Sequence, residues 1–117
     1  MGKTLVVWLN LLPLFSSWLQ MLPIGSCVHP IKMDMEGMVL EDLETVLTSW
    51  SDLHPGCKRP KVLYAITSGS NPAGITWSLA RRRAVYNVAR SHDLMILEDD
   101  AYYFLQFNRV CIVTYNC

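Results

Sequence analysis

The sequence predicts an α/β fold in which mainly parallel strands are flanked by helices. Two apolar runs, residues 61–67 and 93–100, are typical of strands buried on both faces. One amphipathic run separates the two apolar runs, and another amphipathic run precedes residues 61–67. The order helix, strand, helix, strand is typical of βαβ units, which cross over right-handedly in parallel sheets. The 117 residues, 51% hydrophobic and 17% charged, suffice for one modest domain with its own core.

The first helix is expected over residues 40–51. Its apolar residues recur at positions i, i+3, i+4 and i+7: Leu43, Val46, Leu47 and Trp50. Glu41 and Asp42 would lie in the first turn, where the helix dipole favours acidic side chains. A loop over residues 52–60 should lead into the strand at 61–67. An earlier strand is possible near residues 27–32.

The second helix is expected from Ser78, which can cap its amino terminus, to Ser91. Its buried stripe shares the same helical spacing: Val85, Val88, Ala89 and His92. The basic run at residues 81–83 is interpreted as a solvated helix face. Because this helix lies between the two apolar runs, we expect residues 61–67 and 93–99 to form adjacent or near-adjacent parallel strands.

Charge and cysteine usage narrow the classes of partner. Ten basic residues balance ten acidic ones, so no overall field favours nucleic acid or an anionic membrane as a partner. The four cysteines and three histidines show no zinc-ligand spacing, and no metal site is predicted. The even number of cysteines permits two disulfides, but the spacing selects none. This usage weakly favours a reducing compartment and hence a cytoplasmic protein.

The first 25 residues leave an alternative open. Lys3 followed by an apolar run over residues 5–15 resembles the charged and apolar regions of a secretory signal, although no A-x-A-like cleavage triplet follows. The run is short, and Asn10 and Pro13 interrupt it, which disfavours a transmembrane helix. The segment would therefore be either a secretory leader or an apolar segment that belongs inside a core or has lost its partner.

Polar residues follow both predicted strands where ligands bind in open α/β sheets, beyond the carboxyl ends of the strands. Asn71 begins the turn Asn-Pro-Ala-Gly after the first strand, and Asp99 closes the second. Side chains alternate along a strand, so Asp99 should point away from Glu98 and Asp100. We therefore expect one directed acid instead of a metal-binding trio. Alternatively, the first segment is only a type I turn and Asp99 only a solvated strand end.

These residues resemble a known family. The segment from Asn71 to Gly74 is similar to the N-P-x-G turn of fold-type I pyridoxal-phosphate (PLP) aminotransferases, and the segment from Asp99 to Tyr102 is similar to their D-x-A/P-Y motif. The strings LEDLETVLTSW, KVLYAITSGSNPAG and LEDDAYYFLQFN most resemble the kynurenine/α-aminoadipate branch. The resemblance covers residues 16–108. It implies part of a three-layer large domain, with an apolar segment at 1–15 and a divergent tail at 109–117 outside it.

The resemblance also implies roles for individual residues. Asp99 would pair with the pyridinium nitrogen of PLP and keep it protonated, so that the ring can accept electrons. Asn71 and Tyr102 would hydrogen-bond the phenolic oxygen of the ring. An aromatic side chain at Phe15 would stack on the cofactor. Without the resemblance, Tyr102 is equally a core aromatic with a solvated hydroxyl.

One expected residue has no counterpart. The family's PLP-binding lysine follows the D-x-A-Y motif, whereas the last lysine of this sequence is Lys61. Schiff-base formation and proton transfer both need that amine, so we expect no catalytic residue and no transamination by this chain alone. Two other interpretations stay open. The chain is a non-catalytic partner of full-length subunits, since the family forms dimers, or a small secreted protein with an apolar leader.

Overall fold

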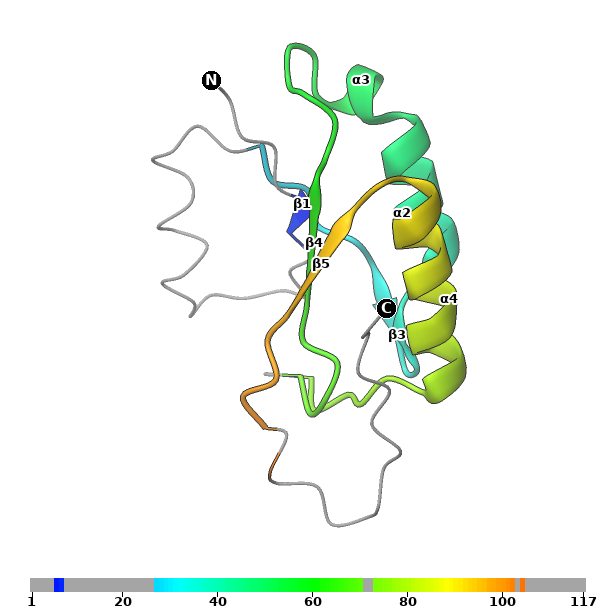
Figure 1. Cartoon of the computed structure of the whole chain (residues 1–117), viewed down its shortest axis with the longest axis vertical. Helices are drawn as coiled ribbons and strands as arrows, with labels where there is room; N and C mark the ends of the chain where they lie inside the picture. The colour runs from blue at the N-terminus through cyan, green and yellow to red at the C-terminus, as the bar shows by residue number, and fades with distance from the viewer. Residues whose placement is uncertain (1–5, 8–26, 71–72, 103, 105–117) are drawn as a thin grey trace.

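A three-stranded parallel sheet forms the centre of the protein (Figure 1). The computed structural model describes residues 6–7, 27–70, 73–102 and 104. Strands β1 (Val6–Val7), β4 (Val62–Ala65) and β5 (Met95–Glu98) lie in the order β1-β4-β5. β4 and β5 pair in parallel from Val62 opposite Met95 to Ala65 opposite Glu98. The prediction that residues 61–67 and 93–99 hold adjacent parallel strands is therefore confirmed.

The strand on the other side of β4 comes from an unexpected part of the chain. β1 pairs in parallel with Leu63 and Tyr64 of β4. The possible strand at residues 27–32 is wrong: within that range only Cys27 makes a bridge, and residues 28–32 are not strand. The apolar run at 5–15 instead supplies two β-branched residues that satisfy the open edge of β4. β2 (Met33–Asp34) and β3 (Gly37–Met38) form a separate antiparallel hairpin.

The helix expected over residues 40–51 is divided into α2 (Leu40–Thr48) and α3 (Trp50–Leu53). At the break, the hydroxyl of Thr48 donates to the carbonyl of Glu44 at 2.8 Å, and the hydroxyl of Ser49 donates to the carbonyl of Thr45. Such side-chain hydrogen bonds compete with the helical ladder and favour an end or a bend. Trp50 is still 1% exposed, so the division preserves the predicted apolar stripe.

Helix α4 (Leu79–Ser91) agrees with its prediction closely. The hydroxyl of Ser78 accepts a hydrogen bond from the backbone N–H of Arg81 at 3.1 Å and so caps the helix. Val85, Val88 and Ala89 are buried as expected, whereas His92 lies just beyond the helix and is half-buried. The helix thus connects β4 to β5 as the crossover of a βαβ unit.

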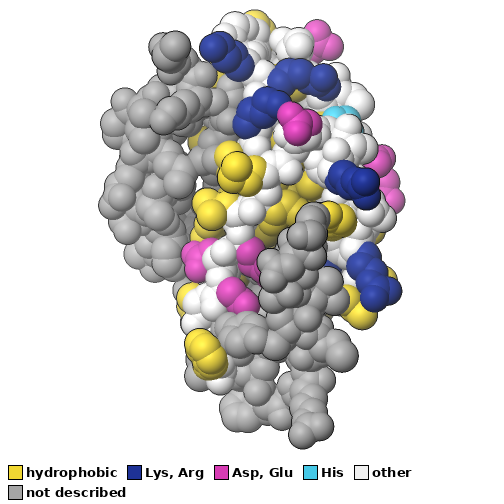
Figure 2. Space-filling view, viewed as in Figure 1, with side chains coloured by type: hydrophobic (Ala, Val, Ile, Leu, Met, Phe, Trp, Pro, Cys, Tyr) yellow, Lys and Arg dark blue, Asp and Glu magenta, His cyan; other side chains and the backbone are white. Residues whose placement is uncertain are grey.

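Helices α2 and α4 cover one face of the sheet (Figure 1). The hydrophobic core lies between these helices and the sheet. It comprises Ile31, Met38, Leu43, Val46, Leu47, Trp50, Leu63, Ala65, Trp77, Val85, Val88 and Ala89. The expectation that β5 is buried on both faces is wrong here, because Met95 is 69% and Leu97 45% exposed. Helices α2 and α4 cover only the opposite face of the sheet from these two side chains. Figure 2 shows hydrophobic side chains at the surface of the molecule.

Within the described ranges, no helix has the length and apolar composition to cross a membrane.

Candidate functional site

The carboxyl ends of β4 and β5 meet at one edge of the sheet. The backbone N–H of Asp99 donates to the carbonyl of Ala65 at 2.8 Å, which extends the pairing by one residue. The turn after β4 closes where the N–H of Ser70 donates to the carbonyl of Ile75 at 2.9 Å. Asn71 lies outside the described residues, as does Phe15, so their expected contacts with a ligand stay predictions.

The carboxylate of Asp99 is exposed and has a defined hydrogen-bond donor. The hydroxyl of Tyr64 donates to it at 2.6 Å. Burial, together with this hydrogen bond and the negative charge of Asp99, holds the pKa of Tyr64 well above its usual value. Asp99 thus stands at the end of β5 as a fixed acceptor. Sequence reasoning missed Tyr64, although the register places it opposite Leu97, on the sheet face that Asp99 shares.

Tyr102 lies against the loop that follows β4. A Cβ added to Gly69 would be 3.7 Å from the Cβ of Tyr102, which is an ordinary van der Waals contact. Gly69 has φ +55° and Tyr102 is half-buried. The structure therefore brings Tyr102 to the chain two residues before Asn71.

Glu98 points to the opposite face of β5 from Asp99, as the alternation predicts. It accepts a hydrogen bond from the hydroxyl of Thr67 and pairs with Arg82 at 3.2 Å. Arg82 also donates to the carbonyl of Thr67 and the hydroxyl of Ser68, each at 3.0 Å. The guanidinium thus joins α4 to the ends of both strands, and it fixes the backbone from which Asp99 projects.

The interpretation of residues 81–83 as a solvated face is wrong for two of the three arginines. The side chains of Arg81 and Arg82 are only 14% and 12% exposed. Arg81 pairs with Asp34 of β2 at 2.8 Å and lowers the pKa of that carboxyl below its ordinary value. Arg81 and Arg82 pair with acidic side chains on the neighbouring strands β2 and β5. The sequence of one helix alone does not reveal such partners. Arg83 alone is exposed.

Two buried polar atoms at this edge have no hydrogen-bond partner among the residues that the structure describes: the hydroxyl oxygen of Ser70 and one carboxylate oxygen of Asp100. Buried polar atoms of this kind are costly unless a water or ligand satisfies them. They lie next in sequence to the predicted site residues, so the edge suits a polar ligand better than an apolar one. No group of three or more His, Cys, Asp or Glu side chains among the described residues is placed to hold a metal ion.

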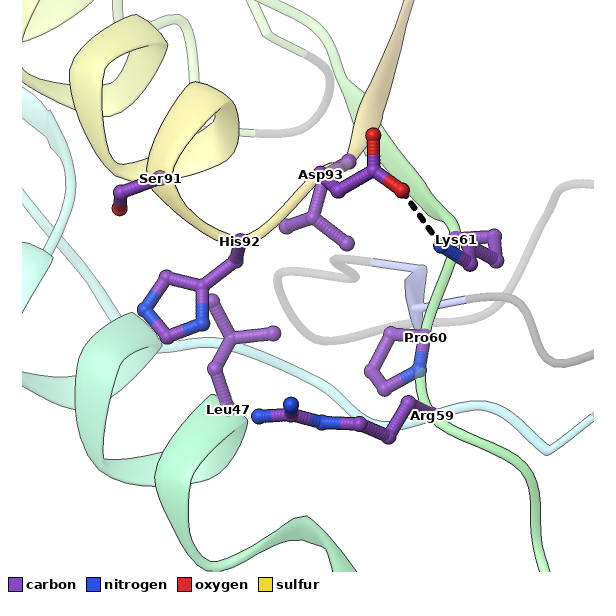
Figure 3. A pocket seen from close by; sticks show the side chains of 8 residues that line it. Leu47, Arg59, Pro60, Lys61, Ser91, His92 and Asp93 are labelled. Carbon is purple, nitrogen blue, oxygen red and sulfur yellow. Dashed lines mark hydrogen bonds and ion pairs between the residues drawn. The ribbon is translucent and has the colours of Figure 1, made fainter.

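A separate cavity of about 250 Å³ lies near the amino ends of β4 and β5 (Figure 3). Its lining residues are Leu47, Arg59, Pro60, Lys61, Ser91, His92, Asp93 and Leu94. Lys61 and Asp93 form an ion pair of 2.6 Å there, which lowers the pKa of Asp93. The amino ends of parallel strands lie at the opposite edge of the sheet from their carboxyl ends, where the predicted site residues are. The cavity therefore includes none of those residues.

The structure pairs two of the cysteines, which the sequence alone left open. Their spacing selects no disulfide, whereas the structure joins Cys27 to Cys57 across 30 residues of sequence.

The chain is similar to known aminotransferases, although no family model matches it. An aromatic amino acid aminotransferase of Schizosaccharomyces pombe is 44% identical over 95 residues, covering 80% of this chain and 20% of that protein. The mitochondrial kynurenine/alpha-aminoadipate aminotransferase of Bos taurus is 35% identical over 101 residues, covering 83% and 24%. The structure of Pyrococcus horikoshii kynurenine aminotransferase in complex with PMP matches with a TM-score of 0.66 at 31% identity, covering 85% and 23%.

The fold, the strand-end residues and these similarities define one class of protein. The homologues of this chain are aminotransferases and its structural neighbours are fold-type I PLP-dependent aminotransferases, and the chain corresponds to about a fifth to a quarter of the length of the relatives it matches. The resemblance and fold class predicted from the sequence are thus confirmed.

Proposed function

We propose that this chain supplies the part of an aminotransferase site that binds the ring of PLP, with Asp99 as the partner of the ring nitrogen. The observation that carries the proposal is the position of Asp99 at the carboxyl edge of the sheet, oriented by the hydroxyl of Tyr64. A carboxylate there can accept the N–H of a pyridinium and keep the ring protonated. When bound, PLP supplies an electron sink for amino-acid chemistry.

The oxygens of Ser70 and Asp100, which find no partner within the described part of the chain, support the fit, since a polar group at this edge would give them one. Asn71 and Tyr102 are proposed to donate to the phenolic oxygen of the ring. The contact of Tyr102 with the loop at Gly69 supports convergence of the two segments. The relatives favour an aromatic amino acid, kynurenine or α-aminoadipate as the amino donor of the whole reaction.

We propose further that the 117-residue chain binds PLP non-covalently and does not transaminate alone. The last lysine in the sequence, Lys61, precedes β4. Its ammonium is paired with Asp93 near the amino end of the sheet, whereas Asp99 is at the carboxyl end. A lysine amine must both hold PLP and move the proton, so turnover requires a lysine from elsewhere.

The test is titration of the purified chain with PLP, followed by the absorbance of the cofactor. We expect Asp99→Asn to weaken binding about 10- to 100-fold, because it removes a charge-assisted hydrogen bond. Asn71→Ala should weaken it less, about two- to tenfold, because it removes a neutral one. Asp52→Asn on the exposed surface of α3 is the matched control and should bind as the parent does. Equal binding by all four proteins would refute the proposal.

A second function is favoured by the uncovered face of β5. Met95 and Leu97 are exposed on β5, which lies at the edge of the sheet that the described strands form. Exposed apolar edge strands are sites of association. The chain would then bind a full-length aminotransferase subunit as a non-catalytic partner. Mixing it with a purified kynurenine/α-aminoadipate aminotransferase should give a complex on size-exclusion chromatography, which the double variant Met95→Lys/Leu97→Lys should abolish. The corresponding control is Leu53→Lys, which changes an exposed leucine on α3.

A further inference from the structure

We propose that Cys27 and Cys57 form a reversible thiol–disulfide exchange site that locks the loop between α3 and β4, residues 54–61, to the segment before β2. The co-reactant is a dithiol, or glutathione, in either oxidation state. The proposal is independent of cofactor binding, because the two cysteines belong to neither the strand-end residues nor the cavity of Figure 3.

Contacts that do not involve sulfur hold Cys57 in place. The backbone N–H of Cys57 donates to the carbonyl of His54 at 3.1 Å and closes a turn. The indole N–H of buried Trp50 donates to the carbonyl of Lys58 at 3.0 Å. The ring of His54 lies on that of Trp50, with centroids 4.3 Å apart and planes inclined by 34°. The loop is thus anchored to the core on both sides of Cys57.

A second set of contacts brings the segment of Cys27 to the same place. His29 and His54 share a hydrogen bond of 2.8 Å between ring nitrogens. The ring of His29 also meets that of Trp50 edge-on at 6.2 Å. Burial, then the charge of His54, lowers the pKa of His29, and the charge of Asp42 opposes this shift. The neutral form of His29 is therefore favoured, and the hydrogen bond between the two rings links the segments through contacts that do not involve the sulfurs.

These contacts favour re-formation of the disulfide after it has been reduced. Two thiols that the fold already holds near each other have a high effective concentration, which favours closing the bond again after reduction. Both cysteines are half-buried, not enclosed in the core, so a small thiol can reach them. The Cα atoms are 6.4 Å apart, within the range that a disulfide spans.

A thiolate of the reductant attacks one sulfur, a mixed disulfide forms, and the bond between Cys27 and Cys57 breaks with its electron pair on the departing sulfur. The second thiol of the reductant then displaces the remaining cysteine. The protein gains two electrons and two protons as two thiols, and the dithiol becomes a disulfide. Oxidised glutathione drives the reverse reaction and leaves as reduced glutathione.

The experiment uses the full chain with Cys111→Ser and Cys117→Ser, so that only the proposed pair remains. After equilibration in glutathione buffers of graded ratio, free thiols are trapped with N-ethylmaleimide and the peptides are identified by mass spectrometry. We expect one linked peptide pair containing Cys27 and Cys57, whose fraction rises smoothly with oxidised glutathione and is the same from either starting state. Two free thiols at every ratio would overturn the proposal. So would a bond that no ratio of reduced glutathione opens.

Matched variants test the contacts themselves. Trp50→Phe removes the hydrogen bond to Lys58 and should make the disulfide about two- to tenfold easier to reduce. Trp77→Phe changes a similarly buried tryptophan, whose indole N–H has no partner among the described residues, and should leave the equilibrium unchanged. Gly56→Ala is a second variant for the case that Trp50→Phe does not fold. Gly56 has φ +84° in the turn beside Cys57, with open space around a Cβ, so alanine strains the loop without disturbing the core. An unchanged equilibrium in both loop variants would contradict the assigned role of the contacts.

Discussion

The hydroxyl of Tyr64 and the carboxylate of Asp99 are joined by a hydrogen bond of 2.6 Å across two neighbouring parallel strands. Tyr64 is half-buried and Asp99 is exposed, so the bond links the interior of the sheet to a charge at its carboxyl edge. It orients the Oδ2 atom of Asp99. Tyr64 therefore acts as a positioning residue for the proposed ring-nitrogen partner.

Tyr64→Phe should lower the free energy of unfolding by about 0.5–1.5 kcal/mol near neutral pH, because it removes this hydrogen bond. The pKa of Tyr64 is raised in the folded protein, so its contribution is fully present below the unfolded value of about 10 and is lost as the pH rises above it. Urea unfolding of both proteins at neutral and alkaline pH checks this. The difference in free energy should shrink above pH of about 10, and a constant difference would contradict the pKa assignment.

The parts of the fold that the sequence predicts are those with local patterns. The amphipathic spacing of α4 and the apolar runs of β4 and β5 occur within a few residues each, and all three elements are found. What was missed depends on partners distant in sequence. The pairing of β1 with β4 and the bond from Tyr64 to Asp99 depend on register across the sheet, which no local periodicity specifies.

The ion pair of Arg82 with Glu98 should contribute to stability more than a surface pair does. Their side chains are 12% and 23% exposed, and Glu98→Gln would leave the guanidinium partly buried with a weaker partner. We expect a loss of about 1–3 kcal/mol in the free energy of unfolding. Glu44→Gln on the exposed side of α2 should change it by less than about 0.5 kcal/mol. Equal effects of the two substitutions in chemical denaturation would show that the pair is not a structural link.

Arg81→Ala should raise the pKa of Asp34 toward its ordinary value. The hydrogen bond from Arg81 is the largest cause of the lowered pKa, followed by that from the backbone of Glu36. A lowered pKa stabilises the fold above the unfolded pKa of about 4, and this stability is lost as the pH falls through the folded value. NMR titration of the Asp34 carboxyl in both proteins measures the shift directly. Glu36 would have to be the dominant partner if the pKa did not move.

Gly37 of the β2–β3 hairpin packs tightly against Trp77 in the segment before α4. A Cβ at Gly37 would lie 2.6 Å from two atoms of the Trp77 ring, and its φ of +123° disfavours any side chain. Trp77 is 3% exposed, so the ring cannot move aside without disturbing the core. Gly37→Ala should therefore lower the free energy of unfolding for two reasons, because it strains the backbone and because its methyl group collides with the Trp77 ring.

The matched substitution is Gly74→Ala, where φ is +67° but a Cβ would meet nothing within 4 Å. This variant carries the backbone cost of about 1–3 kcal/mol without the collision. Gly37→Ala should be less stable than Gly74→Ala by a further 1–3 kcal/mol or so, which is about the cost of overpacking a filled core. Chemical denaturation of both variants gives the difference. If the two lose the same free energy, the Trp77 ring yields to a methyl group and the contact does not fix the hairpin against α4.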